Sequence, residues 1–426
     1  MTIKKEIKIG LLGCGVVGSE VARLLDEKKA LLTERSGATF ILQKVLVRNL
    51  KKRRGTAIPE KKLTTKAEEV ISDPEIDIIV ELMGGIEPAR TLILKALQNG
   101  KQVVTGNKAL LAEKGKEIFQ EASKRNRLIG FEASVAGGIP LLKSVSEGLI
   151  ANTIQASYGI INGTSNFILS AMTERHLSFE VALKQAQEKG YAEADPTLDI
   201  DGSDAAHKLA ILATLCYGVS FPFSKIHVEG IKNITPLDIE MAEKFGYRIK
   251  LLAISRQNNG KVELRVHPTM IRQDHPLASI SGIFNAITLI GDVVGEAMFY
   301  GQGAGGRATA SAVLSDIVAV ARGSSLPVVL QDSAVVTPIE ELKTEYYLRF
   351  STVDKPGVLS RISGILGEHR ISIASVYQHE QDDGAMVPIV IMTHESLEKD
   401  VQKALKEIDS LDVVLNKTNL IRVEKL

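Results

Sequence analysis

Residues 7–25 read IKIGLLGCGVVGSEVARLL, an apolar strand that runs into a Gly-x-Gly-x-x-Gly turn and then into a helix with apolar residues at helical spacing. In this context Gly13 allows the tight turn, Gly15 lets the backbone approach a pyrophosphate, and Gly18 lets the helix pack on the strand. The N–H groups that open such a helix point towards phosphate. The stretch therefore predicts a dinucleotide-binding fold, with cofactor contacts at Gly13, Gly15, Val16, Val17 and Gly18.

The composition excludes several classes of partner and location. With 52 Lys and Arg against 51 Asp and Glu, and no Trp, the chain lacks the basic and aromatic surface of a nucleic-acid binder. Cys14 and Cys216 are too few for a disulfide framework or a zinc knuckle, so we expect a reducing cytoplasm. No signal-peptide core or membrane-length apolar run is present, so we expect neither secretion nor a membrane span.

The order of strand-like and helix-like stretches predicts an α/β chain with several domains. Alternation over residues 1–133 predicts a Rossmann-type parallel sheet covered by helices. Residues 134–304 have longer helices and alternating strands, which predicts an α+β catalytic and dimerisation domain with a mixed sheet. A helical stretch after GQGAGG is expected to pack back on the first domain, which would then include about 305–325.

The last quarter of the chain forms a separate pattern. Residues 326–345 mix Gly, Ser and Pro with short apolar pieces and are expected to be a linker. Residues 346–426 then follow the order strand, helix, strand, strand, helix, strand. This order predicts a C-terminal ferredoxin-like domain.

The segment 193–208, EADPTLDIDGSDAAHK, crowds five carboxylates beside one lysine. One reading is a solvated acidic loop, and a calcium loop fails because Lys208 would take the place of the bidentate Glu. Ser203 can cap a helix that places Asp204 and Lys208 on one face. Inside a cleft, the carboxylate would orient a lysine that protonates a carbonyl oxygen as it gains hydride, while the other carboxylates suit a substrate ammonium. This pattern indicates a dehydrogenase acting on an amino acid with an alcohol or aldehyde.

Two further positions bear on the cofactor. Lys108 follows a predicted strand at the carboxyl edge of the sheet, where ligands bind, although it can equally be an ordinary first-turn lysine. The acid expected after the second strand of an NAD site is replaced by Arg48, with Lys51, Lys52, Arg53 and Arg54 close behind. Arginine suits a 2′-phosphate, so we expect NADP to be preferred over NAD, unless these residues only solvate a loop.

The motifs resemble the homoserine dehydrogenase family through GLLGCGVVGSEV, TGNKALLA, FEASVAGGIP, INGTSNFIL, GYAEADPTLDIDGSDAAHKLAIL and YGQGAGGRATASAV. The resemblance implies reversible reduction of aspartate 4-semialdehyde to homoserine, a step towards threonine, methionine and isoleucine. It makes Lys208 the proton donor, Asp204 its partner and Lys108 a residue between cofactor and substrate. Independently of the resemblance, GQGAGG at 301–306 is either a flexible loop or a glycine-rich turn that lets the backbone approach the cofactor at Gly303. The implied substrate contacts are Gly163, Thr164, Tyr191, Glu193 and Asp199.

The same resemblance implies an ion and a regulator. A monovalent cation, usually sodium, is expected on Glu132 and on the backbone carbonyls of Val135, Gly137 and Ile139. The tail beginning YYLRFSTVDKPGVLSRISGIL resembles an ACT domain, whose loop Asp354, Pro356 and Gly357 is expected to receive an effector, with threonine as the hypothesis. We expect a homodimer or homotetramer, because the mixed sheet and the ACT unit both offer strand edges. The alternatives are another amino-acid NAD(P) oxidoreductase, or a nonenzymatic amino-acid sensor.

Overall fold

The computed structural model describes residues 5–51, 58–324, 334–378 and 386–426. The chain divides into two compact units, each of which is described by itself. The first unit comprises Met1–Ile161, Ala205–Ser224 and Ile283–Ala334, and the second comprises Asn162–Asp204, Lys225–Gly282 and Val335–Leu426. No helix within the described ranges is long and apolar enough to cross a membrane.

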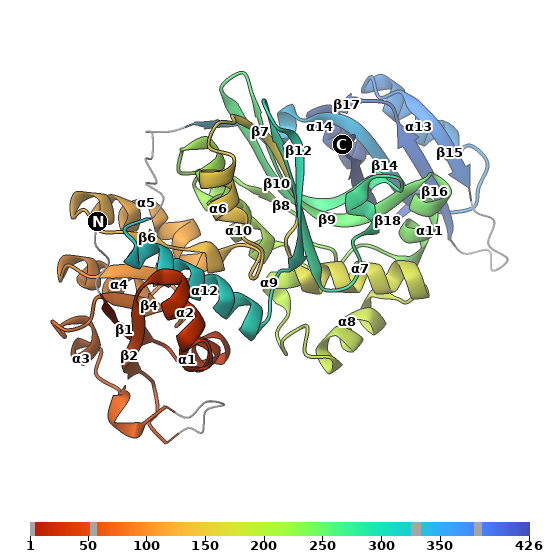
Figure 1. Cartoon of the computed structure of the whole chain (residues 1–426). Helices are drawn as coiled ribbons and strands as arrows, with labels where there is room; N and C mark the ends of the chain where they lie inside the picture. Colours follow the sequence, from red (N-terminus) through yellow and green to blue (C-terminus); the bar gives the residue numbers. More distant parts are fainter. Residues whose placement is uncertain (1–4, 52–57, 325–333, 379–385) are drawn as a thin grey trace. The chain divides into compact units, whose positions relative to one another are not determined.

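The first unit contains a six-stranded sheet in the order β3-β2-β1-β4-β5-β6, with all neighbouring strands parallel (Figure 1). The strand order reverses between β1 and β4, which is where open α/β sheets bind their ligands. The strands are β1 (Glu6–Leu12), β2 (Thr39–Leu46), β3 (Leu63–Thr64), β4 (Ile78–Glu81), β5 (Gln102–Thr105) and β6 (Ile129–Gly130). The flanking helices are α1 (Val16–Glu27), α2 (Lys29–Ser36), α3 (Glu68–Ile71), α4 (Ala89–Gln98) and α5 (Lys108–Lys124).

A helix distant in sequence completes the core of this sheet. In α12 (Gly306–Ala321), Val313 and Ile317 are fully buried in one apolar cluster with side chains of β1, β2, β4 and α1. The helical stretch after the glycine-rich turn is divided into α1 and α2, because Lys28 leaves the helical conformation at φ −105° and ψ 13°. The turn after α1 thereby redirects the chain before β2.

A second, antiparallel sheet in this unit contains β7 (Ile154–Ile160), β11 (Phe284–Gly291) and β12 (Gly295–Gln302), with β11 in the middle. The short helix α6 (Leu141–Lys143) continues as a π-helical turn over Ser144–Gly148. Most of α10 (Ser203–Tyr217) also belongs to the unit. Strand β12 lies at the end of its sheet and is half-exposed or exposed throughout, so it lacks the apolar alternation of a strand covered on one face.

The second unit is built on a long hairpin of β9 (Tyr247–Asn258) and β10 (Lys261–Arg272). Asn259 and Gly260 connect the strands with φ values of 49° and 76°, as a tight hairpin turn requires. The unit also contains α7 (Gly163–Arg175), α8 (Phe179–Glu188), α9 (Thr197–Ile200), β8 (His227–Val228) and α11 (Pro236–Lys244).

The C-terminal fold has the strand order β18-β14-β16-β15, and its two helices share an apolar core with one face of the sheet. Its elements are β14 (Lys343–Thr352), α13 (Val358–Glu368), β15 (Ile373–Gln378), β16 (Val387–Thr393), α14 (Glu398–Ile408) and β18 (Val414–Val423). The end of β18 pairs in parallel with β10, through Thr269 opposite Arg422 and Met270 opposite Val423. Strand β13 (Val335–Val336), within the stretch expected to be a linker, also pairs with β10. The C-terminal fold is therefore joined to the β9–β10 hairpin by main-chain hydrogen bonds.

Candidate active site

The glycine-rich turn has the geometry of a dinucleotide site. Gly13 has φ 96° and donates its N–H to the carbonyl of Leu46 at 3.1 Å, and a side chain there would strike the backbone of Leu82. A side chain on Gly18 would overlap the carbonyl oxygen of Gly13, so helix and turn are in direct contact. A Cβ atom added at Gly15 would have no other atom within 4 Å, so the space beside this residue is open. No side chain caps α1 at this residue. The N–H groups that open α1 at Val16 and Val17 thus fit a pyrophosphate.

The second glycine cluster contacts the first. A side chain on Gly306 would be 2.8 Å from Cγ1 of Val16, at the start of α1. A side chain on Gly303 would instead overlap the amide of Asn285, so close packing within the protein is enough to require this glycine. Gly306, rather than the expected contact Gly303, is therefore the glycine that lies against the dinucleotide turn.

A buried carboxyl organises the loop beside Lys108. Glu81 is fully buried at the carboxyl end of β4, accepts the N–H of Met83 at 2.7 Å and accepts the hydroxyl of Thr105 at 2.7 Å. Burial raises the pKa of Glu81 despite these hydrogen bonds. Asn107 caps α5 through Leu110 N–H and donates its amide to the carbonyl of Gly85 at 2.6 Å. These contacts hold the loop after β4 and the first turn of α5, where Lys108 is half-buried.

The basic residues expected to select the cofactor follow β2. Arg48 and Lys51 are exposed, and Lys52, Arg53 and Arg54 lie outside the described residues. Since Gly13 N–H binds the carbonyl of Leu46, two residues before Arg48, the end of β2 contacts the dinucleotide turn directly. Arg48 is thus on the edge of the sheet where the ribose of a dinucleotide lies in this class of fold.

Lys208 is held inside the first unit. Its side chain is 8% exposed, and Nζ donates to the carbonyl oxygen of Ile161 at 2.7 Å, just after the end of β7. Asp204 precedes it by one turn of α10, on the same face of the helix, and is also buried. The acid and the lysine are therefore not a solvated surface pair.

Two carboxylates of the acidic segment converge on one amide in the second unit. Asn162 donates from Nδ2 to Asp199 Oδ1 at 2.7 Å and to Asp204 Oδ2 at 2.8 Å. Its Oδ1 accepts the N–H of Ser165 at 2.8 Å and so caps α7, while the Ser165 hydroxyl donates to the carbonyl of Asp199 at 2.6 Å. Asn162 is thus a site residue beyond those expected, and the signal for it in the sequence is an Asn directly before Gly-Thr-Ser, a helix-capping pattern.

The other expected substrate residues are partly brought together. Gly163 opens α7, and Thr164 donates its hydroxyl to the carbonyl of Tyr191 at 2.7 Å. The Tyr191 ring, 40% exposed, packs edge-on against Phe167 with ring centroids 5.1 Å apart. Glu193 lies in the exposed stretch that follows. Within this unit the structure thus places Thr164 with Tyr191, and Asp199 with Asp204.

The segment expected to bind a cation is buried, but its carboxylate is already engaged. Glu132 accepts the N–H of Leu142 at 2.9 Å and of Lys143 at 2.8 Å, and its own N–H donates to Asp316 Oδ2 at 2.8 Å. Burial, with Asp316 nearby, raises the pKa of Glu132 to about 7. Val135, Gly137 and Ile139 are also buried. In the described part of the chain no group of three or more His, Cys, Asp or Glu could hold a metal, so a cation here would rely on main-chain carbonyls.

The expected effector loop lies on the surface of the C-terminal fold. Asp354, Pro356 and Gly357 are exposed between β14 and α13. Gly357 occupies the N-cap position of α13, and no side chain there accepts a hydrogen bond from the helix. The first N–H groups of α13 are thus not capped by a side chain at this residue.

Comparison with known families matches nearly the whole chain. Residues 13–132 match the NAD-binding domain of homoserine dehydrogenase, and residues 140–318 match homoserine dehydrogenase itself. Residues 346–413 match the ACT domain. Together with the architecture, these matches confirm the predicted fold class: a Rossmann-like domain, a domain with a mixed sheet and a C-terminal ACT domain.

Full-length relatives agree. The chain is 46% identical to a homoserine dehydrogenase of Helicobacter pylori, over 99% of this chain and 100% of the relative. It is 39% identical to one of Bacillus subtilis, over 99% of each.

Solved structures show the same similarity. A homoserine dehydrogenase from Thiobacillus denitrificans superposes with a TM-score of 0.93 at 45% identity, covering 99% of this chain and 98% of that one. A homoserine dehydrogenase of S. aureus gives a TM-score of 0.79 at 34% identity over 99% of each chain. A mutant of a hyperthermophilic archaeal homoserine dehydrogenase in complex with NADPH gives 0.64 at 25% identity, covering 75% of this chain and 99% of that shorter one.

Proposed function

The chain belongs to the homoserine dehydrogenase family and is an NAD(P)-dependent oxidoreductase, and from this premise we propose that Lys208 donates the proton when aspartate 4-semialdehyde is reduced to homoserine. The observation that carries this assignment is the buried Lys208 ammonium, held on the Ile161 carbonyl and one helical turn from Asp204. A carbonyl acceptor favours the charged form of the amine, as a proton donor requires.

The bound nicotinamide supplies the hydride that reaches the aldehyde carbon. As the carbonyl π electrons move to oxygen, the Lys208 ammonium donates its proton to that oxygen, giving the alcohol and a neutral amine. The amine then regains a proton from solvent. In the reverse direction Lys208 acts as the base. Asp204 favours the ammonium form of Lys208 through its negative charge, which promotes this reprotonation by solvent after each turnover.

Substrate recognition follows from the carboxylates around Asn162. Asp199 and Asp204 would repel each other without a donor between them, and the Asn162 amide satisfies one oxygen of each. We assign Asp199 and Glu193 to the substrate ammonium, and Gly163, Thr164 and Tyr191 to the rest of the amino acid. Lys108, at the start of α5, lies between cofactor and substrate in this assignment.

The decisive experiment follows the absorbance of reduced nicotinamide with homoserine and NADP. Formation of reduced nicotinamide with homoserine, and no such formation when aspartate or a diamino acid replaces homoserine, would support the proposal. A chain that reduces NADP only with one of those other amino acids would refute it. We propose NADP as the preferred cofactor because Arg48 stands where an NAD site carries an acid.

A monovalent cation is proposed beside Glu132, held by the main-chain carbonyls of Val135, Gly137 and Ile139. These residues are buried, and oxygen ligands suit a hard cation. Raising sodium at constant ionic strength should raise the midpoint of thermal unfolding more than tetramethylammonium does. Equal midpoints in the two salts would count against the site.

Feedback inhibition by threonine is proposed for the ACT domain, since homoserine leads towards threonine, methionine and isoleucine. The exposed loop at Asp354, Pro356 and Gly357 opens α13, and its N-cap residue Gly357 has no side chain to cap the helix, which favours a carboxylate at this end. Initial rates should fall across millimolar threonine, and Asp354→Ala should weaken that inhibition. Rates that stay constant would count against threonine as an effector of this domain.

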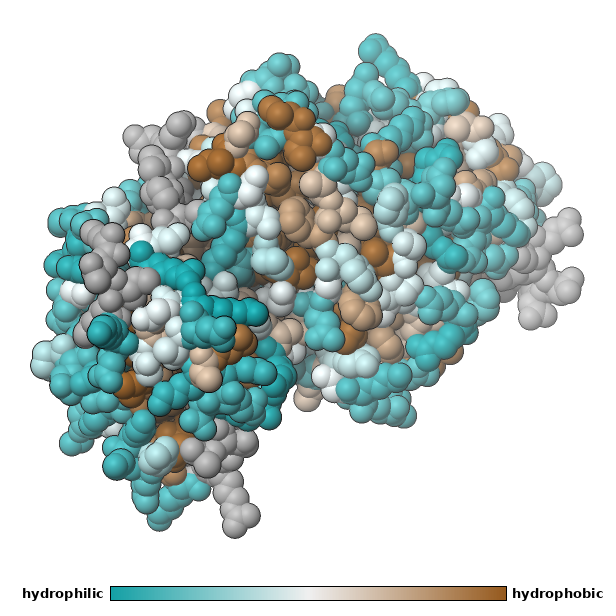
Figure 2. Space-filling view, viewed as in Figure 1, coloured by the Kyte–Doolittle hydropathy of each residue, from teal (hydrophilic) through white to brown (hydrophobic). Residues whose placement is uncertain are grey.

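Self-association is proposed through β12. This strand ends its sheet, and Met298, Tyr300 and the preceding Val293 are exposed. Figure 2 shows hydrophobic surface gathered over this hairpin. An exposed apolar edge strand favours pairing with a second copy across a twofold axis. Light scattering should give a dimer or tetramer, and Tyr300→Lys should shift the protein to a smaller species.

A cytoplasmic location is also proposed, in keeping with the two free cysteines.

A further inference from the structure

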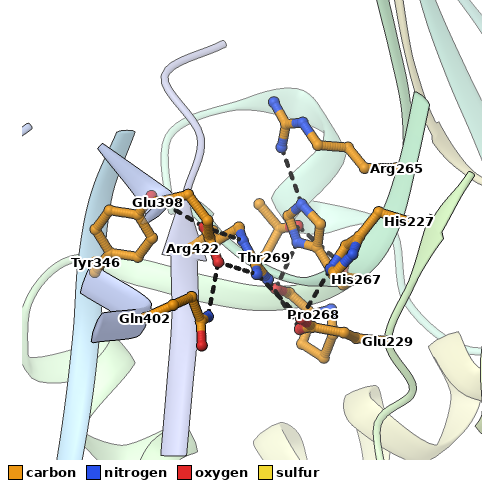
Figure 3. Close-up of polar contacts among 10 residues, drawn as sticks. All are labelled: His227, Glu229, Arg265, His267, Pro268, Thr269, Tyr346, Glu398, Gln402 and Arg422. Carbon is orange, nitrogen blue, oxygen red and sulfur yellow. Dashed lines mark hydrogen bonds and ion pairs between the residues drawn. The ribbon is translucent and has the colours of Figure 1, made fainter. Parts of the chain in front are cut away.

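An arginine near the end of the chain binds two carboxylates at once (Figure 3). Arg422, on β18, is 1% exposed. It donates to Glu398 of α14 at 2.8 and 2.6 Å, and to Glu229 at 2.9 and 3.0 Å. Each pair uses two nitrogen–oxygen contacts, the geometry that fixes position as well as charge. Glu398 is itself part of the ACT domain, so within the ion pairs of Arg422 it is Glu229 that lies outside that domain, beside the main-chain pairing of β18 with β10.

Glu229 is fixed from three sides. Its Oε1 lies 2.8 Å from Nε2 of His227, and its N–H donates to the carbonyl of Val266 on β10 at 2.7 Å. Burial alone would raise the pKa of Glu229, but the His227 contact and the Arg422 charge together hold it well below its usual range. The carboxylate is therefore charged throughout the working pH range.

The residues that follow Glu229 support the substrate segment. Ile231 donates its N–H to the carbonyl of Ile200 at 2.9 Å, and a side chain on Gly230 would overlap that same oxygen. Ile200 ends α9 and follows Asp199, whose carboxylate binds the Asn162 amide. Three consecutive residues thus connect the Arg422 ion pair to the backbone of α9.

We infer that Arg422 and Glu229 are positioning residues for homoserine, which set the place of Asp199 by holding the 229–231 segment against α9. The inference rests on the proposed assignment of Asp199 to the substrate. It gives the ACT domain a part in substrate affinity that does not depend on any bound effector.

The test variant is Glu229→Gln, which keeps the size of the side chain and leaves Arg422 paired with Glu398. The KM for homoserine should rise roughly 3- to 30-fold, the range over which residues in a coupling network act. The KM for NADP and kcat should stay within about twofold, because the dinucleotide turn is not part of this network. Arg422→Lys keeps the positive charge but loses the two nitrogen–oxygen contacts to each carboxylate, and it should also raise the KM for homoserine.

The matched control is Glu345→Gln. Glu345 lies on β14, next to β18, and its carboxylate binds Lys425, so this change removes an ion pair but leaves residues 229–231 untouched. It should leave the homoserine KM unchanged. Amide hydrogen exchange over 197–201 should be faster in Glu229→Gln and unchanged in the control. An unchanged homoserine KM in Glu229→Gln, or equal rises in the KM of both substrates, would overturn the inference. If the native chain does not oxidise homoserine at all, the proposed function fails, and the exchange measurement still decides whether Glu229 orders α9.

Discussion

Lys208 and Ile161 are joined by a hydrogen bond of 2.7 Å from the ammonium nitrogen to the main-chain carbonyl oxygen. Ile161 directly follows β7, a strand buried over most of its length, so the acceptor is fixed by the sheet. The long lysine side chain is thereby limited to few rotamers, which places its proton before any substrate arrives. The relationship makes Lys208 the first residue to test.

Lys208→Ala should lower kcat by about 10²- to 10⁴-fold, the contribution expected of a positioned proton donor. The KM for NADP should change little. Stopped-flow or steady-state absorbance of the nicotinamide measures both constants. Lys225→Ala removes an exposed lysine beyond the end of α10 and serves as the control. A Lys208→Ala enzyme with kcat within tenfold of the native value would remove this residue from the chemistry.

Asn162→Asp should raise the KM for homoserine about tenfold or more, since a third carboxylate would replace the donor between Asp199 and Asp204. Aspartate still caps α7, because an Asp oxygen can accept the N–H of Ser165 as Asn does. The variant therefore separates the capping of α7 by Asn162 from its bridging of Asp199 and Asp204. Unchanged homoserine kinetics would show that the bridging amide does not serve substrate binding.

Arg48→Ala should lower the ratio of kcat/KM with NADPH to kcat/KM with NADH by about tenfold, the worth of one partly exposed charge-assisted hydrogen bond. Lys29→Ala, an exposed lysine on α2, is the control for lost positive charge. Both ratios come from initial rates with each nucleotide. A ratio close to one in the native enzyme would itself retire the NADP assignment.

Local patterns could be predicted from the sequence, and long-range contacts could not. The dinucleotide turn and the Asp204–Lys208 spacing are encoded within one strand, one turn or one helix. By contrast, Asn162 meets Asp204 across 42 positions of sequence and Arg422 meets Glu229 across 193, and no periodicity marks either partner. Strand β12 is hard to recognise for another reason: none of its residues is buried, so it lacks the apolar alternation of a strand that is covered on one face.

Glu132→Gln should flatten the pH dependence of stability. Because the folded pKa of Glu132 is about 7 against an ordinary 4.5, the folded state binds the extra proton between these values. The free energy of unfolding should therefore fall as the pH rises through this range, by at most about 3 kcal/mol from this group. Urea unfolding at pH 5 and pH 8 gives the comparison, with the exposed Glu147→Gln as control. An identical pH profile in the Glu132 variant and the native chain would contradict the raised pKa.

Glu424→Gln should destabilise the protein by roughly 3 kcal/mol, because the buried Arg265 would lose its nearer carboxylate and keep the more distant Glu263, at 3.6 Å. Arg265 is 2% exposed and lies 2.7 Å from Glu424, which is also buried and pairs with Arg256 as well. The Glu345→Gln change, near the start of β14, removes an ion pair with the exposed Lys425 and should cost under about 1 kcal/mol. Chemical denaturation of the two variants measures the difference, and equal losses would show that the buried pair contributes no more than a surface one.

The joining of β18 to β10 sets a condition on any chimaera. A regulatory module grafted from another enzyme would have to supply an arginine for Glu229 and a carboxylate for Arg265, or each of these residues would lose a charged partner. A chimaera must therefore exchange the C-terminal module together with the residues at positions 229 and 265 that bind it. Among related chains, substitutions in the module should be accompanied by substitutions at these two positions.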